Sequence, residues 1–253
     1  MTLQDLITAL ELPISCRVDQ RIPKKLLVEN GATTAVDKRN IIEGIEEIQW
    51  VASLKPSLIG VPEYRDATRE YLEIAMLHIA LRRDAKSFRI AELTHCAVPY
   101  PILLLLTAQD KLSLSMAHIR WAKNETGKVV LDGETVAVDL NEPIHTSDVF
   151  SAFLQALSII RQPRENLRGL YQGWLDTLAA FQAAQITEAF TQTQTDEQAA
   201  TRRASLLACR KFDLQIVALR SAAAKEKQLA RQVALNLEIK QLQAKQQQAR
   251  ALL

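Results

Sequence analysis

The sequence predicts an α+β protein, in which a mixed, mostly antiparallel sheet with covering helices is followed by a helical C-terminal region. Seven of the eight prolines and five of the seven glycines lie before residue 145, as the turns of such a body require. The last 80 residues, 174–253, contain neither glycine nor proline, which favours helix. We expect an α+β body at 1–145, a helical connector or hairpin at 146–190, and a long basic coiled-coil-like helix at 195–253.

The beginning of the body alternates between helical and strand-like patterns. Residues 1–13 have the pattern of a short amphipathic helix. Ile41 and Ile45 share one face of a second helix, predicted over 37–47. From Ile48 to Leu54 apolar residues alternate with polar ones, which predicts a half-buried strand.

A central strand is predicted over 71–81, because its residues are apolar on both parities. The helical pattern resumes at 85–96, with Phe88, Ala91 and His95 on one side. Two prolines at 99 and 101 end this helix and lead into a very apolar strand at 102–106.

Two antiparallel hairpins are predicted in the rest of the body. Residues 112–116 alternate in polarity and return beside the preceding strand after a turn at 108–111. A second hairpin is predicted over 128–140, around an Asp-Gly turn at 132–133, because glycine tolerates positive φ.

The C-terminal region consists of successive helical patterns. An apolar stripe runs through 149–160, and a second helix is predicted over 167–190. The polar segment 191–196 separates these from the final helix, which Thr195 or Asp196 is expected to cap.

The final helix begins with a coiled-coil rhythm that fails at Glu226. We interpret the failure as a local stutter, and expect the helix to pack on its own chain or on a second copy, with a free arm as the alternative. The residues that alternate steps of three and four are Cys209, Phe212, Ile216, Leu219 and Ala223.

Charge is distributed unevenly along the chain. Residues 201–253 hold eleven Lys or Arg and three acidic residues, whereas the first 200 residues hold 20 basic and 26 acidic side chains. A weakly acidic body joined to a basic helix suggests binding, because clustered cations can contact phosphates without reading sequence. The alternative is a solvated helix whose cations only keep it soluble.

The motifs of several enzyme classes are missing from the sequence. It has no G-x-G-x-x-G or G-x-x-x-x-G-K-[ST] loop and no G-x-S-x-G elbow, and its four histidines stand apart. Three distant cysteines indicate neither a disulfide framework nor a zinc site. No apolar run is long enough to span a membrane. We therefore expect a cytoplasmic protein without cofactor or metal. The sequence favours a binding protein over an enzyme.

The candidate binding residues lie in two basic segments. The segment 18–25 surrounds a proline and is interpreted as a rigid basic loop or a solvated connector, and the other segment is the final helix. The residues proposed to contact nucleic acid or a partner are Arg21, Lys24, Lys25, Arg220, Lys225, Lys227, Arg231 and Lys240.

The alternative is a degenerate or unrecognised metal-dependent nuclease. A nuclease of the restriction type needs an acidic residue and an E-x-K motif on adjacent strands to hold Mg²⁺. Asp66 and Glu73 are the best candidates, but Ala75 stands where the lysine of that motif would be.

Short motifs along nearly the whole chain resemble an uncharacterised bacterial family known as a domain of unknown function. Genes of that family often lie beside DNA methyltransferases and helicases of type III-like restriction-modification or phage-defence clusters. The resemblance implies this genomic setting and no established activity. The motifs are R-I-P-K-K at 21–25, I-E-E-I-Q-W at 45–50, A-V-P-Y-P-I at 97–102, L-S-L-S-M at 112–116 and E-K-Q-L-A-R-Q-V-A-L-N-L-E-I-K-Q-L at 226–242.

The leading hypothesis is a non-enzymatic accessory or interaction subunit of a bacterial DNA restriction-modification or phage-defence system. The resemblance implies a methyltransferase or helicase subunit as its protein partner, and the basic helices add DNA as a second partner. A third hypothesis is a structural homodimer built on the C-terminal helices.

Overall fold

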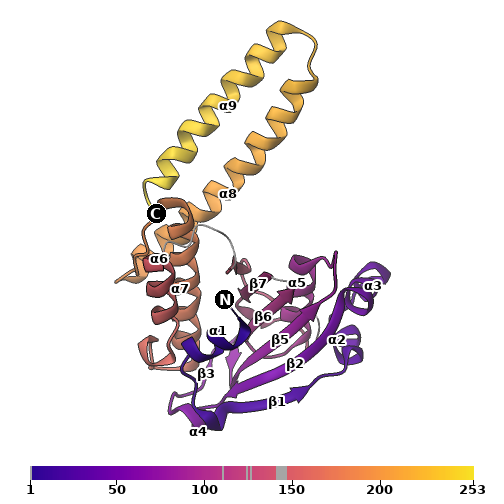
Figure 1. Cartoon of the computed structure of the whole chain (residues 1–253), viewed down its shortest axis with the longest axis vertical. Helices are drawn as coiled ribbons and strands as arrows, with labels where there is room; N and C mark the ends of the chain where they lie inside the picture. Colours follow the sequence, from indigo (N-terminus) through magenta and orange to yellow (C-terminus); the bar gives the residue numbers. More distant parts are fainter. Residues whose placement is uncertain (1, 110, 124, 126, 141–146) are drawn as a thin grey trace. The chain divides into compact units, whose positions relative to one another are not determined.

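The chain divides into two units, Met1–Leu178 and Ala179–Leu253, and the boundary falls within the sequence of helix α7 (Leu167–Thr187). This computed structural model describes residues 2–109, 111–123, 125, 127–140 and 147–253 (Figure 1). The boundary predicted between 145 and 146 falls at the edge of the segment 141–146, which lies outside the described residues.

The centre of the first unit is a six-stranded sheet, counted over the described residues, in the order β1-β2-β5-β6-β7-β10 (Figure 1). Neighbouring strands are antiparallel except for β5 and β6, which are parallel and connected by helix α5. The predicted α+β class with a mixed, mostly antiparallel sheet is confirmed. The strands are β1 (Arg17–Arg21), β2 (Ile45–Leu54), β5 (Ile74–Leu81), β6 (Ile102–Ala108), β7 (Lys111–Met116) and β10 (Val136–Asp139).

Helices pack against this sheet. Three of them contribute to one hydrophobic core with the sheet, in which Ile41, Leu77, Ile79, Ile90 and Leu104 are all buried. Met76 on β5, of the opposite parity, is also buried, so both faces of this strand are covered as predicted. The helices of this core are α2 (Lys24–Gly31), α3 (Ala35–Gly44) and α5 (Ser87–Ala97); the others before α7 are α1 (Leu3–Ala9), η1 (Ile14–Cys16), α4 (Pro56–Ile59), α6 (Ser147–Ala156) and η2 (Ile159–Arg161).

An ion pair between a buried aspartate and a partly exposed arginine joins α3 to α5. Asp37 is only 3% exposed, and its two carboxylate oxygens accept from Nε and Nη2 of Arg89 at 2.9 and 3.0 Å. Thr34, the N-cap of α3, donates to the same carboxylate from its hydroxyl and accepts from the Asp37 amide. These contacts hold the pKa of Asp37 down at about 2, with the Arg89 hydrogen bonds as the main cause.

The prediction of a hairpin over 128–140 is wrong. Strand β9 (Val129–Leu131) pairs with β8 (Ile119–Trp121), which the sequence analysis missed, and β10 pairs with β7. The main sheet offers β10 a longer apolar edge, because Val138 lies opposite Leu114 and both are buried. Local turn chemistry was therefore overridden by pairing with a more distant strand.

Two boundaries in the first half of the body also differ from the prediction. The segment 18–25, interpreted as a loop, contributes an exposed edge strand to the sheet, since β1 runs over Arg17–Arg21. Ile45 begins β2 rather than continuing the helix, because α3 ends at Gly44. A Cβ at Gly44 would lie 2.9 Å from the Ile90 side chain, so the glycine permits this close approach to α5.

The predicted central strand and the helix after it need smaller changes. The strand begins at Ile74, because β4 (Glu70–Tyr71) pairs separately with β3 (Tyr64–Arg65). On α5, Ala91 and His95 are buried as expected, but Phe88 is 62% exposed.

The second unit contains an antiparallel helical hairpin, made by α8 (Asp196–Lys225) and α9 (Leu229–Arg250) (Figure 1). Hydrogen bonds between the helices fix their direction: Gln246 donates to Asp213, and Gln232 donates to the Ala223 carbonyl. The prediction of a single final helix is wrong, because the chain turns at 226–228, where the Glu226 side chain accepts from the Gln228 amide at 2.8 Å.

The coiled-coil rhythm seen in the sequence is the contact between these two helices. Its residues on α8 are buried or half-buried, and α9 carries a second run with the same steps of three and four. The sequence analysis interpreted this change of register as a stutter, but it marks the reversal of the chain. The contact residues on α9 are Gln232, Leu235, Ile239, Leu242, Gln246 and Ala249.

A buried arginine on α8 contacts the segment before α8 and a residue that follows α9. Arg202 donates from Nη1 to the Thr191 carbonyl at 2.7 Å and from Nε to the Leu253 carbonyl at 3.3 Å. The predicted cap is also confirmed, because the Thr195 side chain accepts from the Gln198 amide at the start of α8.

Candidate functional site

Four of the five C-terminal candidate cations gather around the turn of the helical hairpin. Lys225 ends α8, Lys227 lies in the turn, and Arg231 lies in the first turn of α9. Arg220 precedes them on α8, and Lys240 lies further along α9. The folding back of the chain therefore brings together residues that the sequence had placed along one helix.

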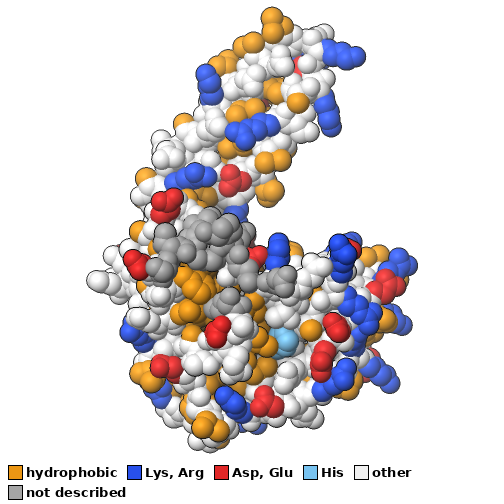
Figure 2. Space-filling view, viewed as in Figure 1, with side chains coloured by type: hydrophobic (Ala, Val, Ile, Leu, Met, Phe, Trp, Pro, Cys, Tyr) orange, Lys and Arg blue, Asp and Glu red, His pale blue; other side chains and the backbone are white. Residues whose placement is uncertain are grey.

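All five of these side chains are exposed to solvent. In the part of the chain that the structure describes, none of them forms an ion pair with a carboxylate. Figure 2 shows Lys and Arg side chains along the hairpin with hydrophobic side chains between them. Unpaired, solvated cations are available to phosphates or to acidic side chains of another molecule.

The three cations of the N-terminal segment have different environments. Arg21 lies on the exposed edge strand, 3.4 Å from Glu47, and Lys25 lies 3.6 Å from Glu29 on the surface of α2. Lys24 instead donates to the carbonyls of Ile42 and Ile45 at the C-terminal end of α3. Desolvation lowers the pKa of Lys24, and the charges of Arg82 and Arg21 act in the same direction.

Lys24 therefore has a structural contact that the sequence did not reveal. A cation at a helix C-terminus satisfies carbonyls that have no partner within the helix and interacts favourably with the helix dipole. Of the three basic residues in this segment, Arg21 and Lys25 are the ones that direct their charge to the surface.

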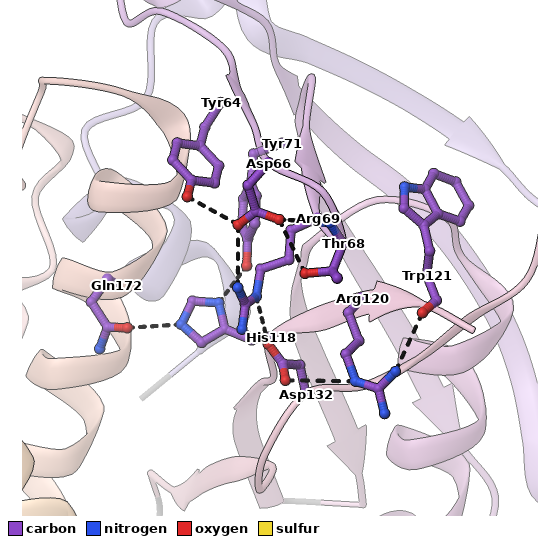
Figure 3. A network of polar contacts seen from close by, with 10 residues as sticks. All are labelled: Tyr64, Asp66, Thr68, Arg69, Tyr71, His118, Arg120, Trp121, Asp132 and Gln172. Carbon is purple, nitrogen blue, oxygen red and sulfur yellow. Dashed lines mark hydrogen bonds and ion pairs between the residues drawn. The ribbon is translucent and has the colours of Figure 1, made fainter. Parts of the chain in front are cut away.

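Asp66, the first candidate of the nuclease alternative, lies in a network of polar contacts (Figure 3). One carboxylate oxygen accepts from the amides of Thr68 and Arg69 and from the Thr68 hydroxyl, at 2.8 to 3.0 Å. The other accepts from the Tyr64 hydroxyl at 3.0 Å and from Arg69 at 3.2 Å. The Thr68 amide is the largest cause of a pKa well below the ordinary value for Asp66.

This network connects the two small hairpins. Arg69, on the β3–β4 hairpin, contacts Asp132 after β9 at 2.6 Å, and Arg120 on β8 lies 3.8 Å from the same carboxylate (Figure 3). The Trp121 amide also donates to the Thr68 carbonyl. The oxygens of Asp66 are thus engaged in holding the β3–β4 turn.

Glu73, the second candidate, lies in a separate environment just before β5. It is 7% exposed, accepts from the Ser53 hydroxyl at 3.0 Å, and lies 3.5 Å from Lys55 Nζ. Asp66 and Glu73 share no contact partner among these. Within the described ranges, no three His, Cys, Asp or Glu side chains are grouped so that they could hold a metal ion.

A chain of aromatic and polar residues, which the sequence analysis did not identify, connects β4, the residue before β8 and α7 (Figure 3). His118 Nδ1 contacts the Tyr71 hydroxyl, and Nε2 lies 2.8 Å from Gln172 Oε1. Gln172 donates its amide nitrogen to Asp176, so its Oε1 accepts, and Nε2 of His118 carries the proton. Nearby, the Tyr171 hydroxyl lies 2.8 Å from the Ile102 carbonyl and 3.0 Å from the Ala117 carbonyl, and it accepts from the Ala117 amide at 3.1 Å.

Burial of three described histidines makes the stability of the fold sensitive to acid. It lowers the pKa of His95 to about 3, and it is also the main cause of the lowered pKa values of His78 and His118. His95 is fully buried, its Nε2 lies 3.0 Å from the Ser115 hydroxyl, and its Nδ1 has no hydrogen-bond partner among the described residues. Protonation would therefore place a charge in the core.

We expect the free energy of unfolding to fall as the pH decreases from 6.5 to 5. Between these pH values the histidines bind protons in the unfolded state but stay neutral in the native state. The free energy of unfolding is therefore highest above pH 6.5 and falls as the pH drops below it. The shift of His95 alone predicts a loss of about 2 kcal/mol at pH 5. Urea unfolding at both pH values measures it. His95→Gln should reduce this pH dependence, and an unchanged pH dependence in that variant would contradict the assignment.

Among the described residues, no helix combines the length and the apolar character that crossing a membrane requires.

Comparison with known families gives one match that covers most of the chain. The model of DUF4391, a domain of unknown function, matches residues 10–245, which include the sheet and nearly all of the helical hairpin. Searches of curated proteins and of solved structures gave no match. The chain therefore belongs to the DUF4391 family of domains of unknown function.

Proposed function

We propose that this protein is a non-enzymatic accessory subunit of a bacterial DNA restriction-modification or phage-defence system. In this role it contacts nucleic acid or a partner protein through its basic helices. The observation that carries the proposal is the group of exposed, unpaired cations at the turn of the helical hairpin. Membership in a family of unknown function is compatible with this role and adds no activity to it.

The turn of the hairpin suits a phosphate backbone better than a specific base sequence. Lys225, Lys227 and Arg231 lie within seven residues of chain, and Glu226 is the one acidic residue among them. The Glu226 side chain is engaged with the Gln228 amide. Cations on helices bind phosphates with an affinity that depends on salt and not on sequence.

A methyltransferase or helicase subunit is the protein partner that we propose. The resemblance of the short sequence motifs to a family encoded beside such enzymes is the basis for this choice. An accessory subunit in that setting would hold its enzyme near DNA, and a basic helical hairpin is suited to the DNA side of such a contact.

Replacing Lys225, Lys227, Arg231 and Lys240 together by glutamine tests the DNA contact. We expect weaker binding to duplex DNA, and a slope of log affinity against log salt that falls by about 3 to 4, since each lost phosphate contact contributes about 0.9. Fluorescence anisotropy of a labelled duplex at several salt concentrations measures both.

The matched control neutralises four exposed cations of the first unit: Lys38, Arg39, Arg83 and Lys86. The control should bind DNA nearly as the wild type does. Unchanged binding in the hairpin variant, or an equal loss in both variants, would refute the DNA contact. Metal-dependent DNA cleavage that disappears in Glu73→Ala would favour the nuclease alternative.

A further inference from the structure

The outward side of α8 carries aliphatic residues that the hairpin does not bury. Leu207, Leu214 and Val217 are 46%, 74% and 62% exposed. Each lies two residues before a residue of the α8–α9 contact, and two residues turn an α-helix through about 200°. These three side chains therefore point away from α9, and we call them the α8 stripe.

The spacing of the α8 stripe is that of a coiled-coil seam. Leu214 follows Leu207 by seven residues, and Val217 follows Leu214 by three, so the leucines occupy the a positions of two successive heptads and Val217 the d position of the second. A stripe of only a and d positions is narrower than the apolar face of a membrane-surface helix, which typically also carries Trp or Phe. The stripe fits one further helix.

The charges around the α8 stripe are almost all positive. Arg210 lies at the d position between the two leucines, and Lys211 and Arg220 lie at the flanking e and g positions. All three are exposed and form no ion pair with any described residue. Asp213 is the one acidic residue of α8 after Glu197, and it accepts a hydrogen bond from Gln246 of α9.

We propose that the α8 stripe docks an acidic amphipathic helix of a protein partner. The partner would place aliphatic residues against the stripe and glutamate or aspartate beside Lys211 and Arg220. This inference rests on the proposed function, because it identifies the protein-binding surface of the same hairpin. It assigns protein binding to the outward side of α8, which includes Arg220, and DNA binding to Lys225, Lys227 and Arg231 at the turn with Lys240 beyond it.

A second copy of the chain is a poorer occupant. Packing two α8 stripes together would bring Arg210, Lys211 and Arg220 of both copies into one interface with little acidic charge to balance them. Nucleic acid is also a poorer ligand for the α8 stripe, since aliphatic side chains at heptad spacing donate no hydrogen bonds to phosphates or bases.

The test uses the full chain and two synthetic four-heptad peptides with leucine at a and d. One peptide carries glutamate at e and g, and the other carries lysine there. We expect the acidic peptide to bind and the basic one not to bind, as measured by fluorescence anisotropy. Leu207→Ser with Leu214→Ser should weaken acidic-peptide binding about tenfold or more, because each buried leucine contributes more than a tenfold change in affinity requires.

The matched control is Val233→Ser with Leu237→Ser, which removes two aliphatic residues, 50% and 56% exposed, from the outward side of α9. Its peptide binding should stay within about twofold of the wild type, as expected outside the contact. The charge-reversal variant Lys211→Glu with Arg220→Glu should prefer the basic peptide. This reversal remains informative even if the serine variant folds poorly.

Several outcomes would overturn the inference. These are no binding of the acidic peptide, equal binding of both peptides, an equal loss in the α9 control, or retained preference for the acidic peptide after charge reversal. A dimer in sedimentation velocity that Leu207→Ser with Leu214→Ser dissociates would assign the stripe to a second copy. If the same double serine variant lost binding to duplex DNA or to anionic vesicles, the α8 stripe would be assigned to DNA or to a membrane surface instead.

The variant with glutamine at 225, 227, 231 and 240 separates the two proposals. If it loses DNA binding but still binds the acidic peptide, the two surfaces are distinct, as we expect. If the wild-type chain binds the peptide and shows no affinity for DNA, the DNA contact fails while the docking site stands.

Discussion

Arg89→Met is expected to lower the free energy of unfolding by about 2 to 3 kcal/mol, because it leaves the buried carboxylate of Asp37 without its cation. The carboxylate cannot regain water easily, since Asp37 is only 3% exposed. Thr33 and Thr34 would remain as donors, which limits the loss. The Arg89 side chain is 43% exposed, so the expected loss is below that of a fully buried pair.

Urea unfolding followed by tryptophan fluorescence measures this effect. The three tryptophans, at 50, 121 and 174, all lie in the first unit, so the signal reports the unit that contains the ion pair. The control is the double variant Arg89→Met with Asp37→Asn, which removes both charges and should recover part of the loss. A single variant as stable as the wild type, or a double variant less stable than the sum of the two single changes, would contradict this account.

The strands of the body could be predicted where their apolar pattern was decisive. β6 and β7 are predicted correctly because Ile102–Leu106 is continuously apolar and the next strand alternates. β10 was assigned the wrong partner, because the sequence shows that Val136 and Val138 form a strand but not which edge they join. Exposed β1 was missed altogether, since Arg17–Arg21 contains a single apolar residue, Val18.

The helical hairpin illustrates a different limit. The steps of three and four on α8 were identified correctly, and so was the failure of the rhythm at Glu226. Helix reversal at 226–228 has no glycine or proline to mark it, and Glu226 closes the turn with its side chain. The available signal was a second run of the same steps, from Gln232 to Ala249, in its own register.

For the candidate site, sequence composition was a better guide than individual residues. The positive charge of the final segment is exposed as expected, and the turn of the hairpin concentrates it. Lys24 was grouped with the surface cations, although it contacts the end of α3, because such a contact depends on two helices meeting in space. The contacts of His118 with Tyr71 on β4 and with Gln172 on α7 were likewise beyond sequence reasoning, because they join segments that are far apart along the chain.

Trp174→Ala is expected to lower the free energy of unfolding by about 3 to 5 kcal/mol, the largest single loss that we predict in the first unit. Trp174 lies on α7 with no exposed surface, and its Nε1 donates to the Leu157 carbonyl at 2.8 Å. The change removes a large buried ring and leaves that carbonyl without its donor.

Two variants separate the parts of this effect. Trp174→Phe keeps much of the apolar volume but loses the hydrogen bond, so it should cost less than the alanine change. Trp50→Ala is the matched control, because Trp50 also donates its Nε1 to a backbone carbonyl, that of Ala52 at 2.9 Å, but is half-buried. Fluorescence of the remaining tryptophans during urea unfolding measures all three. If Trp50→Ala proved as costly as Trp174→Ala, burial on α7 could not be the source of the loss, and the role given to Trp174 would be wrong.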